Sequence, residues 1–148
     1  MRKRIATNLT FMLVLALACR VAPNASVSGA LRTAAGKSLN GSEIRLQSLT
    51  DFTWSYFVAF GPYTSRRSAE EVLGFSWPDF DKFGLEGSDA FSLLVFVSDN
   101  TVGHVEQLPR CHPDFSPTAL GRKLLPESAV FILRKGADCD VLDPRSAV

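Results

Sequence analysis

The sequence predicts an α+β fold, with a small antiparallel sheet of about four strands and one main helix, preceded by a signal peptide and a flexible tether. Three observations carry this prediction. They are a basic and then apolar N-terminus that ends in small residues, several strand-like apolar runs, and one short helical pattern between the first two runs. We therefore divide the chain into a signal peptide at 1–18, a tether at 19–41 and a single globular α+β domain at 42–148.

The N-terminus has the three parts of a signal peptide. Arg2, Lys3 and Arg4 form a positive segment, residues 9–18 are apolar, and Ala16-Leu17-Ala18 has the small-x-small form of a cleavage site. The apolar stretch is shorter than the roughly 20 residues that a membrane-spanning helix needs. We therefore expect the chain to be exported.

Cys19 directly follows the expected cleavage site. Ala16-Leu17-Ala18-Cys19 resembles a bacterial lipobox, in which the cysteine thiol is lipidated and becomes the new N-terminus. The lipobox usually has Leu three places before the cysteine, and this chain has Ala16 there. The resemblance implies a lipid on Cys19 and a protein held at the periplasmic side of the membrane, and the alternative is plain secretion.

The two other cysteines of the chain are Cys111 and Cys139. If Cys19 is acylated, they form an even pair in an oxidising compartment, where disulfides form and persist. We therefore predict a disulfide between them. The alternative is two unpaired thiols.

Residues 19–41 are rich in Ala, Ser, Asn and Gly and show no period that buries a face. This composition predicts a flexible tether. Within it, residues 30–39 carry a weak helical pattern, which is the alternative for that stretch.

The predicted domain begins with a strand and a helix. Aromatic and β-branched residues alternate over 52–60, as in a half-buried strand, and Gly61-Pro62 ends the run. Residues 64–73 then have a helical pattern in which Thr64 or Ser65 is the N-cap and Gly74 is the stop.

A β-hairpin is the clearest local prediction. Residues 91–98 are apolar on both faces, Asp99-Asn100 has turn chemistry, and 101–108 has a strand-like composition. Two prolines force irregular backbone around Cys111. A further strand is expected at 129–134 and a short edge strand at 139–142.

Composition and charge exclude one class of partner. Hydrophobic residues make up 46% of the chain and charged residues 21%, as in ordinary folded domains. The formal net charge is +1, but three of the basic residues lie in the expected signal peptide and no basic run remains in the body. We therefore expect no nucleic-acid partner.

No catalytic motif stands out. Cys111 and His112 are adjacent, and neighbours in an extended chain point in opposite directions, so they do not form a nucleophile–base pair. A disulfide would also consume the thiolate of Cys111. Acidic pairs occur at Asp79/Asp81, Glu70/Glu71 and Asp138/Asp140, but spacing alone does not place two carboxyls across a substrate. We expect no catalytic residue.

A metal site would need three or four converging ligands. The candidates are His104, Cys111, His112, Asp114 and Cys139, and they show neither a C-x-x-C nor an H-x-x-x-H spacing. We expect neither a metal nor a cofactor.

Three aromatic residues lie in loops rich in Pro and Gly: Tyr63, Trp77 and Phe80. Exposed aromatic residues are efficient interface anchors. Together with Arg110 they form the candidate interaction surface.

Several short stretches resemble small uncharacterised bacterial envelope lipoproteins. They are residues 54–60, Gly61-Pro62-Tyr63-Thr64, the helix that ends in Leu73-Gly74, Leu94-Val95-Phe96-Val97 and Pro109-Arg110, and the resemblance covers residues 42–131. It implies an envelope location and defines no activity. The expectation is therefore a non-enzymatic module that binds an envelope protein. The alternative is a small periplasmic hydrolase or ligand-binding protein whose pocket uses His104, His112 or the acidic pairs.

Overall fold

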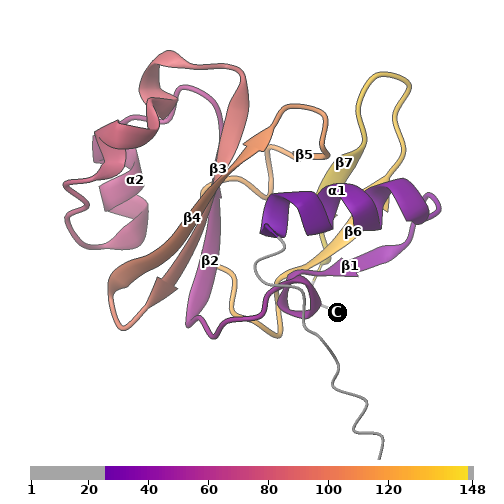
Figure 1. Ribbon diagram of the computed structural model, residues 1–148, viewed down its shortest axis with the longest axis horizontal. Coiled ribbons are helices and arrows are strands. Elements are labelled where there is room, and N and C mark those ends of the chain that lie inside the picture. The colour runs from indigo at the N-terminus through magenta and orange to yellow at the C-terminus, as the bar shows by residue number, and fades with distance from the viewer. Residues whose placement is uncertain (1–25, 147–148) are drawn as a thin grey trace, which may run out of the picture.

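Two α-helices and two sheets make up residues 26–146, the part of the chain that this computed structural model describes (Figure 1). The α+β class is therefore confirmed. The strands form a sheet of three and a sheet of four, instead of one sheet of about four. The expected signal peptide, Cys19 and the first part of the expected tether lie outside the described residues.

The three-stranded sheet contains β2 (Tyr56–Phe60), β3 (Phe91–Ser98) and β4 (Thr101–Pro109), in that order and antiparallel. Asp99 and Asn100 join β3 to β4 with φ angles of 51° and 57°. Positive φ at both central residues is the signature of a type I′ hairpin turn, which Asp and Asn tolerate. The predicted hairpin is therefore confirmed.

Helix α2 (Arg66–Leu73) covers one face of this sheet. The Ser65 hydroxyl caps its N-terminus by accepting from Ser68 N, and Gly74 ends it with φ of 84°. Two 3₁₀ turns follow, η2 (Phe80–Phe83) and η3 (Leu85–Gly87). The residues that α2 and these turns bury with β2 and β3 include Ala69, Leu73, Phe80, Leu85, Val58, Phe60, Leu93 and Val95.

The four-stranded sheet has the order β1-β6-β7-β5. Its strands are β1 (Glu43–Arg45), β6 (Val130–Arg134), β7 (Val141–Pro144) and β5 (Asp114–Phe115). The first three are antiparallel, whereas β5 pairs with β7 in parallel. The sheet thus joins an early strand, β1, to strands near the C-terminal end of the described chain.

Helix α1 (Val27–Lys37) corrects the prediction of a tether. Val27, Leu31 and Ala35 are buried at a spacing of four residues, and they pack with β1, β6 and the second face of the three-stranded sheet. Ser26 to Lys37 therefore belong to the folded body, which was expected to begin only near Ser42. The apolar stripe of this helix is narrow and includes Ala, which is why the composition of 19–41 looked unstructured.

The two sheets share one core on the side away from α2. Figure 1 shows α2 and α1 on opposite sides of the three-stranded sheet, with the four-stranded sheet beside α1. Phe57, Phe96, Phe115 and Phe131 meet there with ring centroids 5.1 to 6.4 Å apart. No helix within residues 26–146 has the length and apolar character needed to cross a bilayer.

The predicted disulfide is present between Cys111 and Cys139. Cys111 follows β4 of the three-stranded sheet, and Cys139 precedes β7 of the four-stranded sheet. The bond therefore links the two sheets.

Candidate ligand pocket

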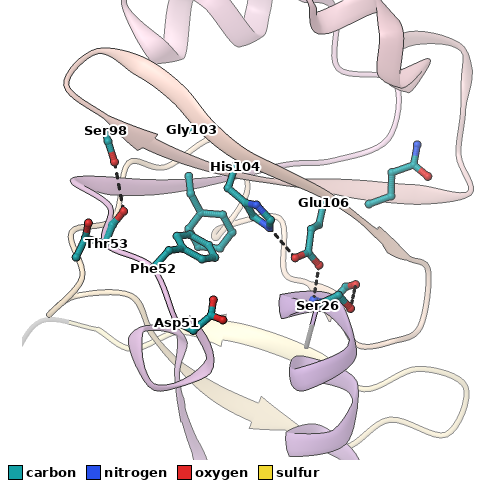
Figure 2. A pocket seen from close by; sticks show the side chains of 11 residues that line it. Ser26, Asp51, Phe52, Thr53, Ser98, Gly103, His104 and Glu106 are labelled. Atoms are coloured by element: carbon teal, nitrogen blue, oxygen red, sulfur yellow. Dashed lines mark hydrogen bonds and ion pairs between the residues drawn. The ribbon is translucent and has the colours of Figure 1, made fainter. Parts of the chain in front are cut away.

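A pocket of about 920 Å³ opens between the start of α1, strand β4 and the segment that leads into β2 (Figure 2). The side chains that line it include those of Asp51, Phe52, His104 and Glu106 and the hydroxyls of Ser26, Ser28, Thr53 and Ser98. The sequence placed His104 on a strand but gave no reason to join it to residues 51–53. The structure brings these parts together.

A β-bulge at Gly103 determines which face of β4 the pocket residues occupy. Phe96 pairs with His104 and Val97 pairs with Val102, so Gly103 is one residue too many on β4. Without the bulge, strict alternation would put Val102 on the same face as His104. Instead Val102 packs on the α2 side, while His104 and Glu106 face the pocket.

Glu106 holds the N-terminus of α1 against β4. Its Oε1 accepts from Val27 N and its Oε2 accepts from Ser28 N, each at 2.9 Å. A carboxylate is favourable there because the first N–H groups of a helix lack partners and carry partial positive charge. Burial alone would raise the pKa of Glu106, but the hydrogen bonds from Ser28, His104 and Val27 outweigh it and lower the pKa.

The imidazole of His104 is fixed by the same carboxylate. Its Nε2 lies 2.7 Å from Glu106 Oε1, and its ring lies 4.6 Å from the Phe52 ring, centroid to centroid. A carboxylate accepts and does not donate, so Nε2 carries the proton in the neutral ring and Nδ1 is an acceptor. Within residues 26–146 the structure gives Nδ1 no hydrogen bond, so this atom is available to a ligand.

Asp51 supplies a second carboxylate at the exposed rim of the pocket. It lies just beyond the 3₁₀ turn η1 (Leu46–Leu49), and in the described part of the chain it has neither a hydrogen bond nor an ion pair. Neither Lys nor Arg is among the described residues that line this pocket. Its two carboxylates, those of Asp51 and Glu106, therefore have no Lys or Arg beside them in the described pocket lining.

Three of the pocket hydroxyls, those of Ser26, Ser28 and Ser98, have partners within the chain. Ser26 Oγ accepts from Gly29 N and lies 3.3 Å from Ser28 Oγ, and Ser98 Oγ donates to Thr53 O at 3.4 Å. Among the described residues, none of these hydroxyls contacts the imidazole of His104. The arrangement fits recognition of a ligand better than a nucleophile with its base.

The candidate interaction surface is only partly right. Tyr63 is 62% exposed, but Trp77 is 6% and Phe80 is 1% exposed, so the prediction that these two are surface anchors is wrong. Their rings pack against each other at 5.3 Å under the 3₁₀ turns. Pro and Gly indicated an irregular backbone correctly, but they do not determine where the aromatic side chains point.

Tyr63 and Arg110 both bind the segment 85–90 through their backbones. Tyr63 N donates to the carbonyls of Leu85 and Ser88, and Arg110 N donates to the carbonyl of Ala90. The guanidinium of Arg110 is paired with Asp114 at 2.9 Å. Two of the four predicted interaction residues thus contact the same short segment of the chain.

The remaining chemical candidates are engaged separately. Cys111 and Cys139 are bonded to each other, and Asp114, which lies beside them, accepts from Arg110 and from Cys111 N. Neither His112 nor any of the acidic pairs lines the His104 pocket. Several members of those pairs have partners instead, such as Asp79 with Lys82 and Glu71 with Arg67.

Sequence reasoning singled out His104 but missed Asp51, Phe52 and Glu106. His104 and Glu106 are two apart on a strand, so alternation could have placed them on one face. The contact with residues 51–53 is long-range, and no local signal predicts it. No family model, curated protein or solved structure matches this chain. The fold and the site define an α+β domain with an acidic and aromatic pocket.

Proposed function

We propose that this chain is an exported, non-enzymatic ligand-binding protein of the cell envelope, held by a lipid on Cys19, with its ligand site beside His104. The observation that carries the proposal is an open pocket in which Glu106 fixes the imidazole of His104 and leaves Nδ1 free for a ligand. Pre-ordered polar groups in a concave, partly aromatic site are typical of small-molecule binding. The resemblance to bacterial envelope lipoproteins supports the location.

The early start of α1 supports a role near the membrane. Ser26, which lines the pocket, lies seven positions after Cys19. An extended chain spans at most about 3.6 Å per residue, so a lipid on Cys19 would keep Ser26 within about 25 Å of the bilayer surface. The pocket would then lie close to the lipid headgroups.

The pocket can be tested with the only two histidines of the chain. The purified mature chain is mixed with a small-molecule extract of the envelope, and NMR follows both imidazoles. We expect the His104 resonances to shift and those of His112 to stay. In the His104→Ala variant the nearby amide shifts should vanish, whereas His112→Ala should behave as wild type. Equal responses from both histidines, or no response, would contradict the proposal.

The anchor needs its own measurement. Mass spectrometry of the mature N-terminus should find a lipid-modified Cys19, and Cys19→Ser should release the protein from membranes. An unmodified Cys19 would remove the anchor from the proposal and leave the pocket as it is.

A second candidate function is protein binding through Tyr63 and Arg110. Tyr63 is exposed and has φ of 61°, a conformation that is uncommon for an aromatic residue and often occurs at functional positions. Pull-down from envelope extracts with wild type and Tyr63→Ala tests it. A partner retained equally by both would rule out this surface.

A further inference from the structure

The ligand class follows from which groups in the His104 pocket remain free to bind. We propose that the pocket binds a primary ammonium group, held between the Asp51 carboxylate, Nδ1 of His104 and the face of the Phe52 ring. This inference rests on the proposed function, because it names the ligand class for the same pocket. The argument has three independent parts, which are charge, hydrogen-bonding capacity and ring chemistry.

The charge of the pocket favours a cation. Two carboxylates line it, those of Asp51 and Glu106, and among residues 26–146 neither a Lys nor an Arg does. Glu106 accepts hydrogen bonds from the helix N-terminus and from His104, but Asp51 has no partner in the described chain. An anionic ligand would meet an uncompensated carboxylate, whereas an ammonium group would neutralise it.

Asp51 and His104 both offer hydrogen-bond acceptors to a ligand. In the neutral ring, Nε2–H of His104 donates a hydrogen bond to Glu106 Oε1, which leaves the Nδ1 lone pair as an acceptor. The Asp51 carboxylate also accepts only. An ammonium group has three donors and no acceptor, so it matches this set.

Phe52 contributes the third part. Its ring is partly exposed in the pocket, and it lies 4.6 Å from the His104 ring and 5.2 Å from that of Phe96. Phe52 and Phe96 meet in a T-shaped arrangement with an interplanar angle of 90°. The face of an aromatic ring attracts a cation placed over it.

Acetylation provides a matched test, because it removes the charge of an amine and keeps the rest of the molecule. The probes are glucosamine against N-acetylglucosamine, and Nα-acetyl-lysine amide against its Nε-acetylated form. Titration of the mature chain is followed by NMR at Gly103, His104 and Phe52. We expect each amine to bind at least about tenfold more tightly than its acetylated partner.

Two substitutions connect this preference to the pocket. Asp51→Asn removes one negative charge at an exposed position and should reduce amine affinity about tenfold or more, whereas Asp138→Asn, also exposed and outside the pocket, should not. Phe52→Leu keeps apolar volume and should weaken amine binding. Thermal melting of each variant establishes that it is folded.

The outcomes separate the inference from the function on which it rests. Equal binding of amines and acetylated probes, or wild-type amine binding by Asp51→Asn, would overturn the ammonium site and leave a ligand pocket. Binding of the envelope extract without binding of either amine would do the same. Failure of both the probes and the extract to perturb His104 would overturn the ligand pocket as well.

Discussion

Glu106 is the residue on which helix α1 and the pocket both depend. Its carboxylate accepts from Val27 N, Ser28 N and His104 Nε2, and its side chain is 13% exposed. A hydrogen bond to a buried charged group contributes more than a neutral one. Replacing Glu106 would therefore leave all three of these donors without their acceptor at once.

We expect Glu106→Gln to lower the free energy of unfolding by about 1–3 kcal/mol at neutral pH, because an amide replaces a charged acceptor. The pKa of Glu106 is lowered in the folded state, so its carboxylate stabilises the fold above the ordinary carboxyl pKa. That contribution is lost as the pH falls through the folded-state value. The gap between wild type and variant should therefore shrink in acid.

Urea denaturation at pH 7 and at a series of acidic pH values measures this gap. Glu127→Gln, at an exposed glutamate outside the pocket, is the matched control and should change stability little at any pH. A gap for Glu106→Gln that is constant with pH would contradict the role of the charge.

Trp77 shows why burial has to be measured. The structure places it 6% exposed beneath the 3₁₀ turns, so Trp77→Ala should cost about 3–5 kcal/mol of stability. Tyr63→Ala, at an exposed aromatic position, should cost far less. Urea midpoints compare the two, and similar small losses would show that Trp77 is a surface residue after all.

At the scale of elements, the local sequence predicted the elements whose contacts lie close together in the chain. Asp99-Asn100 between two apolar runs predicted the β3–β4 hairpin, and Ser65 and Gly74 marked the ends of α2. Helix α1 was not predicted because its buried positions are spaced among Ala, Ser, Thr and Gly, and its packing depends on β1, β6 and β4. The pocket was not predicted for the same reason, since its lining comes from three segments that lie far apart in the chain: Ser26 and Ser28, residues 51–53, and β3–β4.

The docking of α1 makes a direct prediction. Leu31 is fully buried on its inner face, whereas Leu39, just beyond the helix, is 81% exposed. Leu31→Ala should lower stability by about 2–5 kcal/mol, and Leu39→Ala should change it by no more than about 0.5 kcal/mol. Urea denaturation of both variants tests this. Equal small effects would show that residues 26–41 are a flexible tether, as the sequence predicted, and not a packed helix.

The whole molecule is two sheets that share a core and one covalent link. The Cys111–Cys139 bond spans a sequence separation of 28 residues. In the chain-entropy account, a loop of that length contributes about 3–4 kcal/mol by restricting the unfolded state. Replacing both cysteines with serine should lower the free energy of unfolding by about this amount, measured by urea denaturation without reductant.

Wild type measured with reductant should match that double variant, because both have lost the same constraint. A double variant as stable as the oxidised wild type would show that the link contributes nothing.

The strand order β1-β6-β7-β5 also determines when each sheet is able to fold as the chain emerges. A chain leaves the ribosome, or a secretion channel, from its N-terminus, so α1 and β1 emerge long before the strands that cover them. The β2–β3–β4 sheet is made of consecutive or nearly consecutive segments and is able to form early. The four-stranded sheet cannot form until β6 and β7 have emerged. Helix α1 can therefore complete its packing only after almost the last strand is available.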